Sequence, residues 1–218
     1  MTAFLDKDIR EPLFDFLEEN FGKTRIIEEK NIGDSRADVI MVTENGLYGI
    51  EIKSDADTYA RLSGQVKDYD KYFDKNIVVV GSSHAHSIEE HVPAHWGIIT
   101  AESIDGKADF YILRQACKNP NIELAKELSI LWRPEIAQLQ LLNEMPKYDY
   151  LSKKNVIEKI CDRVPEKIDH EKITTQICDL LFERDYEKIA ETVNAYRTAH
   201  GHKPRRNRVK RRRRKRKT

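Results

Sequence analysis

One hairpin constrains the fold of this 218-residue chain more than any other feature. Two segments rich in β-forming residues, Ala37–Thr43 and Leu47–Ile52, stand on either side of the dipeptide Asn45-Gly46. Asn-Gly is the strongest short signal for a two-residue turn, because such a turn needs a backbone conformation that these two residues tolerate. The sequence therefore predicts two adjacent antiparallel strands, whose pairing can be worked out residue by residue.

That pairing decides which side chains share a face of the ribbon. With a two-residue turn at Asn-Gly, Asp38 lies opposite Lys53, and Ile40 lies opposite Glu51. Opposed residues share a face, as do residues two apart along one strand. Asp38, Glu51 and Lys53 are therefore expected on one face, within side-chain reach of one another. The other face carries the apolar residues Val39, Met41, Ile50 and Ile52, which predicts a core.

The rest of the chain predicts a mixed sheet followed by helices. The expected helices are Asp6–Asn20 and Asp57–Phe73, and the further strands are Arg25–Glu29, Ile77–Val80, Trp96–Thr100 and Phe110–Leu113. The resulting order, α-β-β-β-α-β and then β-β, is that of an α/β fold with a mixed sheet. Helical periodicity follows over residues 121–199. We expect a domain over residues 1–118, a helical region over 119–200 and a disordered basic tail over 201–218.

Charge is divided unevenly along the chain, although the net charge is only +1. The last residues hold twelve cations and no acid, and the preceding 202 residues hold 26 basic and 37 acidic residues. The twelve are Lys203, Arg205, Arg206, Arg208, Lys210, Arg211, Arg212, Arg213, Arg214, Lys215, Arg216 and Lys217. Such a segment binds phosphate backbones without reading sequence, which predicts DNA as partner, with RNA as an alternative. A solvated end and a nuclear-import address are other interpretations of the same pattern.

Several classes of protein are excluded by what the sequence lacks. No stretch approaches the roughly 20 apolar residues of a membrane span, so we expect no membrane partner. The segment Met1–Arg10 lacks the apolar centre of a signal peptide. Three scattered cysteines favour reduced thiols over a disulfide framework. We therefore expect a cytoplasmic protein.

The set on the hairpin face suits a divalent cation. Asp38 and Glu51, with the backbone carbonyl of Ile52 nearby, form a hard oxygen site of the kind that Mg²⁺ or Mn²⁺ prefers. A metal there could lower the pKa of a bound water and neutralise charge on a phosphate, with Lys53 orienting the water. This chemistry is phosphodiester hydrolysis. The alternative is that the alternating charges mark the solvated face of a strand.

These residues resemble a known family. Arg36-Ala37-Asp38-Val39 and the run from Tyr48 to Lys53 are similar to the motif of the PD-(D/E)XK nuclease superfamily. The order α-β-β-β-α-β is also that of its core. The resemblance implies that Asp38 and Glu51 bind metal and that Lys53 assists the attacking water. Ala37 departs from the pattern, since many members have proline at this position.

The following helix extends the resemblance. Gln65 and Tyr69 lie four residues apart, hence on one helical face, and resemble the Gln-x-x-x-Tyr motif of RecB-type members. The residues around this helix are similar to small stand-alone bacterial and phage proteins of the superfamily. The resemblance covers roughly residues 6–101 and implies a catalytic role for Gln65 and Tyr69. A helix-surface amide at Gln65 and a core tyrosine at Tyr69 are the alternatives.

Further residues enter as candidates at the edge of the site. Many members of the superfamily have an upstream acidic metal ligand, for which Glu29 is the first candidate and Glu11 the second. Arg36 and Arg61 are candidates for contact with phosphate. The predicted function is a Mg²⁺-dependent or Mn²⁺-dependent nuclease, a hydrolase that cuts DNA. The alternative is a nuclease-fold protein that binds nucleic acid or a protein partner without catalysis, and a homodimer or a targeting partner stays open.

Overall fold

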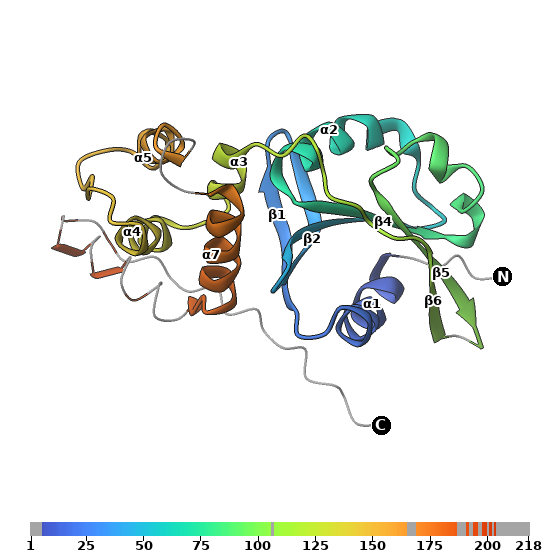
Figure 1. Cartoon of the computed structure of the whole chain (residues 1–218). Coiled ribbons are helices and arrows are strands. Elements are labelled where there is room, and N and C mark those ends of the chain that lie inside the picture. The colour runs from blue at the N-terminus through green and yellow to red at the C-terminus, as the bar shows by residue number, and fades with distance from the viewer. Residues whose placement is uncertain are drawn as a thin grey trace, which may run out of the picture. The chain divides into compact units, whose positions relative to one another are not determined.

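The structure, a computed structural model, places most of the chain in a sheet with helices around it (Figure 1). It describes residues 6–105, 107–164 and 169–186, together with 191, 194, 195, 198, 199, 201 and 203. All of the basic segment after Lys203 therefore lies outside the described residues, as does part of the 119–200 region. In the described part, no helix is long and apolar enough to cross a membrane.

A six-stranded sheet forms the centre of the described residues. Its strands are β1 (Arg25–Ile32), β2 (Ser35–Thr43), β3 (Gly46–Lys53), β4 (Lys75–Gly81), β5 (Gly97–Ile104) and β6 (Lys107–Arg114). They lie in sequence order across the sheet. β3, β4 and β5 run parallel to one another, and the other neighbouring pairs are antiparallel. The predicted α/β fold with a mixed sheet is thus confirmed.

Helices cover both faces of this sheet (Figure 1). The α-helices are α1 (Asp6–Phe21), α2 (Leu62–Tyr72), α3 (Leu124–Leu128), α4 (Arg133–Leu142), α5 (Lys153–Cys161) and α7 (His170–Phe182). Short 3₁₀ turns lie at η1 (Tyr59–Arg61), η2 (Ser82–His84) and η3 (Ile88–Glu90). α1 packs Ile9, Leu13 and Leu17 into one core, where they meet the predicted apolar face of the hairpin.

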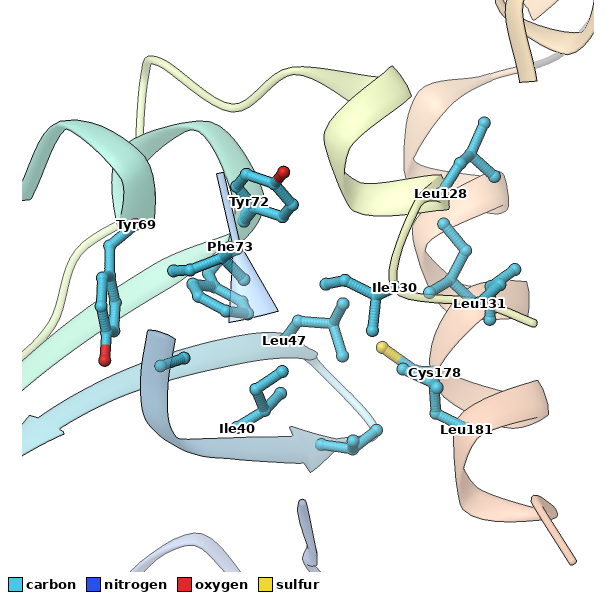
Figure 2. Packing of buried hydrophobic residues seen from close by; sticks show 14 of the residues in the cluster. Ile40, Leu47, Tyr69, Tyr72, Phe73, Leu128, Ile130, Leu131, Cys178 and Leu181 are labelled. Carbon is cyan, nitrogen blue, oxygen red and sulfur yellow. The ribbon is translucent and has the colours of Figure 1, made fainter. Parts of the chain in front are cut away.

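The opposite face of the sheet belongs to a second core, which α2 and the later helices share. Figure 2 shows Ile40 and Leu47 of the sheet together with Phe73, facing Ile130 of the turn after α3 and Leu181 of α7. All five side chains are at most 5% exposed. The helices after residue 119 therefore complete the core of the sheet. The compact unit extends from Met1 to Phe182, and Glu183–Thr218 forms a second unit.

The turn of the hairpin differs from the prediction by one residue. Glu44 and Asn45 form the turn, Thr43 pairs with Gly46, and Val39 pairs with Ile50. The Thr43 hydroxyl explains the difference, because it accepts a hydrogen bond from the Asn45 amide (3.1 Å) and donates one to the Gly46 carbonyl (3.0 Å). The predicted opposition of Ile40 to Glu51 is therefore wrong, and Ile40 pairs with Gly49. The pairing moves by two positions, so every side chain keeps its predicted face.

The helix predicted over Asp57–Phe73 also begins later than expected. Asp57 accepts hydrogen bonds from the amide of Ser54 (2.8 Å) and from its hydroxyl (2.7 Å). This local turn follows β3 directly, and the 3₁₀ turn η1 precedes α2. Asp and Ser side chains compete with helix formation in this way. The consequence is that the first turn of α2 stands beside the carboxyl end of β3.

A candidate phosphate-binding pocket

Asp38 lies where β2 separates from β3. The ladder between the two strands ends at the pair Val39 and Ile50. Beyond this pair, the Ile52 amide donates to Asp38 Oδ2 at 3.0 Å instead of to a carbonyl of the β2 backbone. The Tyr69 hydroxyl accepts the Asp38 amide at 3.1 Å, which fixes the backbone from the other side. Asp38 is therefore held in place by hydrogen bonds to the Ile52 amide and the Tyr69 hydroxyl, and a shift of β2 along β3 would break the bond to Ile52.

Glu51 is the centre of a buried hydrogen-bond network. Its Oε1 accepts the Lys53 ammonium (2.6 Å) and the Gln65 amide (2.5 Å), and its Oε2 accepts the Tyr69 hydroxyl (2.7 Å). Lys53 also donates to Gln65 Oε1 at 3.0 Å. Glu51 and Lys53 are 1% and 5% exposed. The structure thus brings together the five residues predicted for the site: Asp38, Glu51, Lys53, Gln65 and Tyr69.

Burial and charge shift the acidity of this network. Burial raises the pKa of Glu51, and the neighbouring Asp38 carboxylate raises it further, while Lys53 and Tyr69 act in the opposite direction. Burial and the two carboxylates also raise the pKa of Tyr69 well above its ordinary value. Tyr69 therefore remains a hydrogen-bond donor to Glu51 at neutral pH. Two carboxylates close enough to disfavour each other's charge create a demand for cations.

The network opens into a cavity of about 1050 Å³. The cations that line it are Arg10, Arg36, Lys53 and Arg61. Asp34, Asp38, Glu51 and Asp57 line it as well, so the formal charges balance. Arg36 and Arg61 are exposed, and Arg61 stands at the start of α2. The cavity therefore has the carboxylates of the buried Glu51 and the partly buried Asp38 at its floor and exposed guanidinium groups at its rim.

The two candidates for an upstream metal ligand do not line this cavity. Glu29 lies on β1 with its side chain half exposed, and its carboxylate is 4.0 Å from the Arg36 guanidinium. Its backbone adopts a left-handed conformation, with φ of 54°. Glu11 is exposed on α1. Across the described part of the chain, no cluster of three or more His, Cys, Asp or Glu side chains has metal-binding geometry.

The acidic donors at the pocket are therefore few but of a suitable kind. Asp38 and Glu51 both supply carboxylate oxygens to the cavity, and Ile52 between Glu51 and Lys53 also lines it. Mg²⁺ commonly binds proteins through one or two carboxylates and keeps several waters. The donor chemistry of these residues thus fits Mg²⁺ or Mn²⁺ with water completing the coordination.

Arg10, Asp34 and Asp57 are charged pocket residues that the sequence did not single out. The Arg10 guanidinium lies 3.3 Å from Asp38 Oδ1 and 3.3 Å from the Asp38 carbonyl oxygen. It directly follows Ile9, which faces the core, so its position at the border of the apolar face was the available signal. Asp57 closes the turn after β3, for which an acid three residues after Ser54 was the signal.

Fold and site together define an α/β protein with a charged pocket at the point where two central strands separate. The chain belongs to the family of bacteriophage P4 protein cII, whose family model matches residues 2–206. Protein cII of Enterobacteria phage P4 is 25% identical over 115 residues, which are 52% of this chain and 44% of that protein. The match thus spans less than half the length of this relative.

One solved structure is also similar. SfsA of Pyrococcus furiosus, determined in complex with Ca²⁺, gives a TM-score of 0.33 at 13% identity. The similarity covers 56% of this chain and 67% of the SfsA chain.

The family overturns the predicted activity. Assignment to the PD-(D/E)XK nuclease superfamily is wrong, as is the prediction of a DNA-cutting hydrolase, because the family that spans residues 2–206 is phage P4 protein cII. The physical reason is that the geometry of a hairpin determines which side chains are neighbours, but it does not determine whether they catalyse a reaction. Here Lys53 donates to both Glu51 and Gln65 inside a buried network. A lysine bonded in this way serves equally well as the counter-charge of a buried glutamate.

Proposed function

We propose that this protein binds nucleic acid without cleaving it, with DNA as the first candidate and RNA as the second. The observation that carries the proposal is the cavity of about 1050 Å³, with Arg36 and Arg61 at its exposed rim. A protein of this kind acts by occupying nucleic acid, as regulatory proteins do. A cytoplasmic location remains a prediction from the sequence.

The rim of the pocket suits a phosphate group. Guanidinium groups bind phosphate through two parallel hydrogen bonds, and Arg36 and Arg61 approach the cavity from different elements. The first turn of α2 adds backbone N–H groups and the positive end of the helix dipole. Gly64 in that turn leaves space, because a Cβ there would meet no atom within 4 Å. A phosphate can thus approach the backbone of the helix closely.

The floor of the pocket suits a divalent cation beside that phosphate. We propose that Asp38 and Glu51, with the backbone carbonyl of Ile52, hold Mg²⁺ or Mn²⁺. The cation would supply the positive charge that the balanced lining lacks and would attract a phosphate oxygen. In the same proposal, the order α1-β1-β2-β3-α2-β4 is a restriction-endonuclease-like core that is used for binding.

The basic segment adds affinity that is independent of sequence. Twelve cations follow residue 202, whereas the preceding residues carry a net charge of −11. We propose that residues 1–118 form the pocket, that residues 119–200 support its fold, and that residues 201–218 bind the phosphate backbone of the nucleic acid. Each phosphate neutralised releases counterions, so affinity should fall steeply with salt.

Fluorescence anisotropy with labelled DNA and RNA tests this proposal. The full-length protein should bind in Mg²⁺, and denaturing gels of the same mixtures should show uncut strands after overnight incubation. Arg61→Gln should weaken binding about tenfold, since a guanidinium–phosphate pair contributes roughly 1–2 kcal/mol. Deleting residues 203–218 should weaken binding and also reduce the slope of log affinity against log salt.

Glu144→Gln is the matched control for surface change, because Glu144 is an exposed acid outside the pocket lining. It should bind like the wild type. Absence of binding to every nucleic acid tested, or equal binding by Arg61→Gln and the wild type, would refute the pocket as the phosphate site. Strand cleavage that Lys53→Met abolishes would refute a role without catalysis.

A further inference from the structure

Arg10 is placed so that it contacts the carboxylate that the metal proposal needs. It belongs to α1, whose buried residues pack against the face of the sheet opposite to α2. Its guanidinium passes to the pocket, where one nitrogen lies 3.3 Å from Asp38 Oδ1 and the other lies 3.3 Å from the Asp38 carbonyl oxygen. Glu28 on β1 holds the same guanidinium from a further side, at 3.7 Å. The side chain is only 16% exposed.

Each carboxylate on the floor of the pocket thus has its own internal cation. Lys53 neutralises Glu51 at 2.6 Å, and Arg10 neutralises Asp38. The two pairs differ in how they are built. Lys53 is also fixed by Gln65 within the buried network, whereas Arg10 reaches Asp38 from a helix on the other face of the sheet. Arg10 is therefore the cation that can move away without leaving the Glu51 network unsatisfied.

We propose that Arg10 competes with a divalent cation for Asp38 and so sets the metal affinity of the pocket. The inference rests on the proposed metal site at Asp38 and Glu51. A guanidinium group and a divalent cation repel each other at the distance of a shared carboxylate, so Asp38 serves one of them fully at a time. In the absence of metal, Arg10 keeps Asp38 neutralised and the pocket intact. Metal binding releases Arg10 from Asp38 and leaves its charge at the edge of the pocket.

The competition has a reciprocal consequence for α1. If Arg10 weakens metal binding through Asp38, metal binding must weaken the hold of Arg10 on Asp38 by the same factor. The Asp38 contact links the start of α1 to the strand edge of the pocket, so its loss should loosen the first turns of that helix. Divalent metal is thereby coupled to the dynamics of an element on the opposite face of the sheet.

Calorimetric titration of Mn²⁺ into the full-length protein tests the inference. Arg10→Gln retains a long polar side chain and removes the charge, so Mn²⁺ should bind about tenfold more tightly than to the wild type. Lys154→Gln is the control, because it removes one positive charge from an exposed residue of α5 that pairs with Glu158 and lies outside the pocket lining. Its Mn²⁺ affinity should stay within twofold of the wild type. Asp38→Asn should abolish the Mn²⁺ heat in the wild-type and Arg10→Gln backgrounds.

Hydrogen exchange gives a second readout. Mn²⁺ should accelerate exchange of the amides in the first turns of α1 in the wild type, and Arg10→Gln should exchange fast with or without Mn²⁺. Equal Mn²⁺ affinity of Arg10→Gln and the wild type would overturn the role of Arg10 and leave the metal site standing. Absence of Mn²⁺ binding to both proteins would overturn the metal site itself, and the inference with it.

Discussion

Replacing Asp74 with asparagine should stabilise the protein at neutral pH. Asp74 lies between α2 and β4, and its Oδ2 accepts the Leu47 amide at 2.8 Å, just after the hairpin turn. Burial and, to a smaller extent, the fully buried Glu127 raise the pKa of this carboxyl to about 6, while the Leu47 hydrogen bond and His170 act in the opposite direction. The ionised Asp74 carboxylate therefore destabilises the folded protein, although it accepts the Leu47 hydrogen bond next to the hairpin turn.

The raised pKa sets the size and sign of the effect. Because the folded protein holds the Asp74 proton more tightly than the unfolded chain, stability is greatest at acid pH and falls as pH rises through 4 to 7. Each pKa unit corresponds to about 1.4 kcal/mol, so a rise from 3.8 to about 6 costs roughly 3 kcal/mol at pH 7. Asparagine avoids this cost but accepts a weaker hydrogen bond from Leu47, which is worth about 1 kcal/mol less. The expected net gain is about 1–2 kcal/mol at pH 7.

Urea unfolding at pH 4.5 and pH 7.5, followed by circular dichroism, measures the difference. Asp74→Asn should be more stable than the wild type at pH 7.5, and the gain should disappear at pH 4.5. Asp149→Asn is the control, because that side chain is 73% exposed and pairs with Lys147 at 3.6 Å, so its effect should stay below about 0.5 kcal/mol. A loss of stability in Asp74→Asn that is equal at both pH values would show that the Leu47 hydrogen bond outweighs the buried charge.

Three further substitutions test the packing and charge of the pocket region. Gly49→Ala should cost about 3 kcal/mol in urea unfolding, because the new Cβ would stand 2.2 Å from the Phe73 ring. Lys53→Met should lower the free energy of unfolding by about 3 kcal/mol at pH 7, since Glu51 loses its counter-charge, and adding Glu51→Gln should restore much of it. Gly64→Ala should raise stability by about 0.5–1 kcal/mol in the same assay, because the site is helical and open, while weakening the anisotropy signal for DNA.

The hairpin shows how far the sequence alone can reach. The face of each side chain was predicted correctly although the turn was misplaced, because side chains alternate with a period of two and the pairing moved by two positions. The Thr43 hydroxyl bonds to the backbone of Asn45 and Gly46, two and three residues further on, and these bonds favour a turn at Glu44-Asn45 over the turn that Asn-Gly predicts. Long apolar runs such as β4 were located well for a related reason, since a strand buried on both faces leaves no polar alternative.

Contacts between distant elements were beyond the reach of local patterns. The position of Arg10 beside the core residue Ile9 places it at the border of the apolar face, but it does not identify Asp38, 28 positions away, as its partner, because that contact depends on how α1 packs across the sheet. The sequence predicted a helical region over residues 119–200 and did not indicate which surface it covers, and in the fold α7 packs Leu181 into the same core as Ile40 of the sheet. Periodicity indicates that a helix has an apolar face, and only the assembled fold determines what that face covers.

The candidate site illustrates the difference between assembling residues and assigning them a task. Asp38, Glu51, Lys53, Gln65 and Tyr69 met because strand and helix periods fixed their faces. The same bonds that hold them together limit what they can do. Lys53 gives two hydrogen bonds to Glu51 and Gln65 at 2.6 and 3.0 Å, so freeing it for proton transfer would leave a buried carboxylate without its cation. The network is stable while Lys53 stays bonded to Glu51, and using Lys53 as a catalytic base would cost the free energy of that buried ion pair. The chemistry at the pocket is therefore decided by what Asp38 contacts, which is why Arg10 and the divalent cation are the pair to measure.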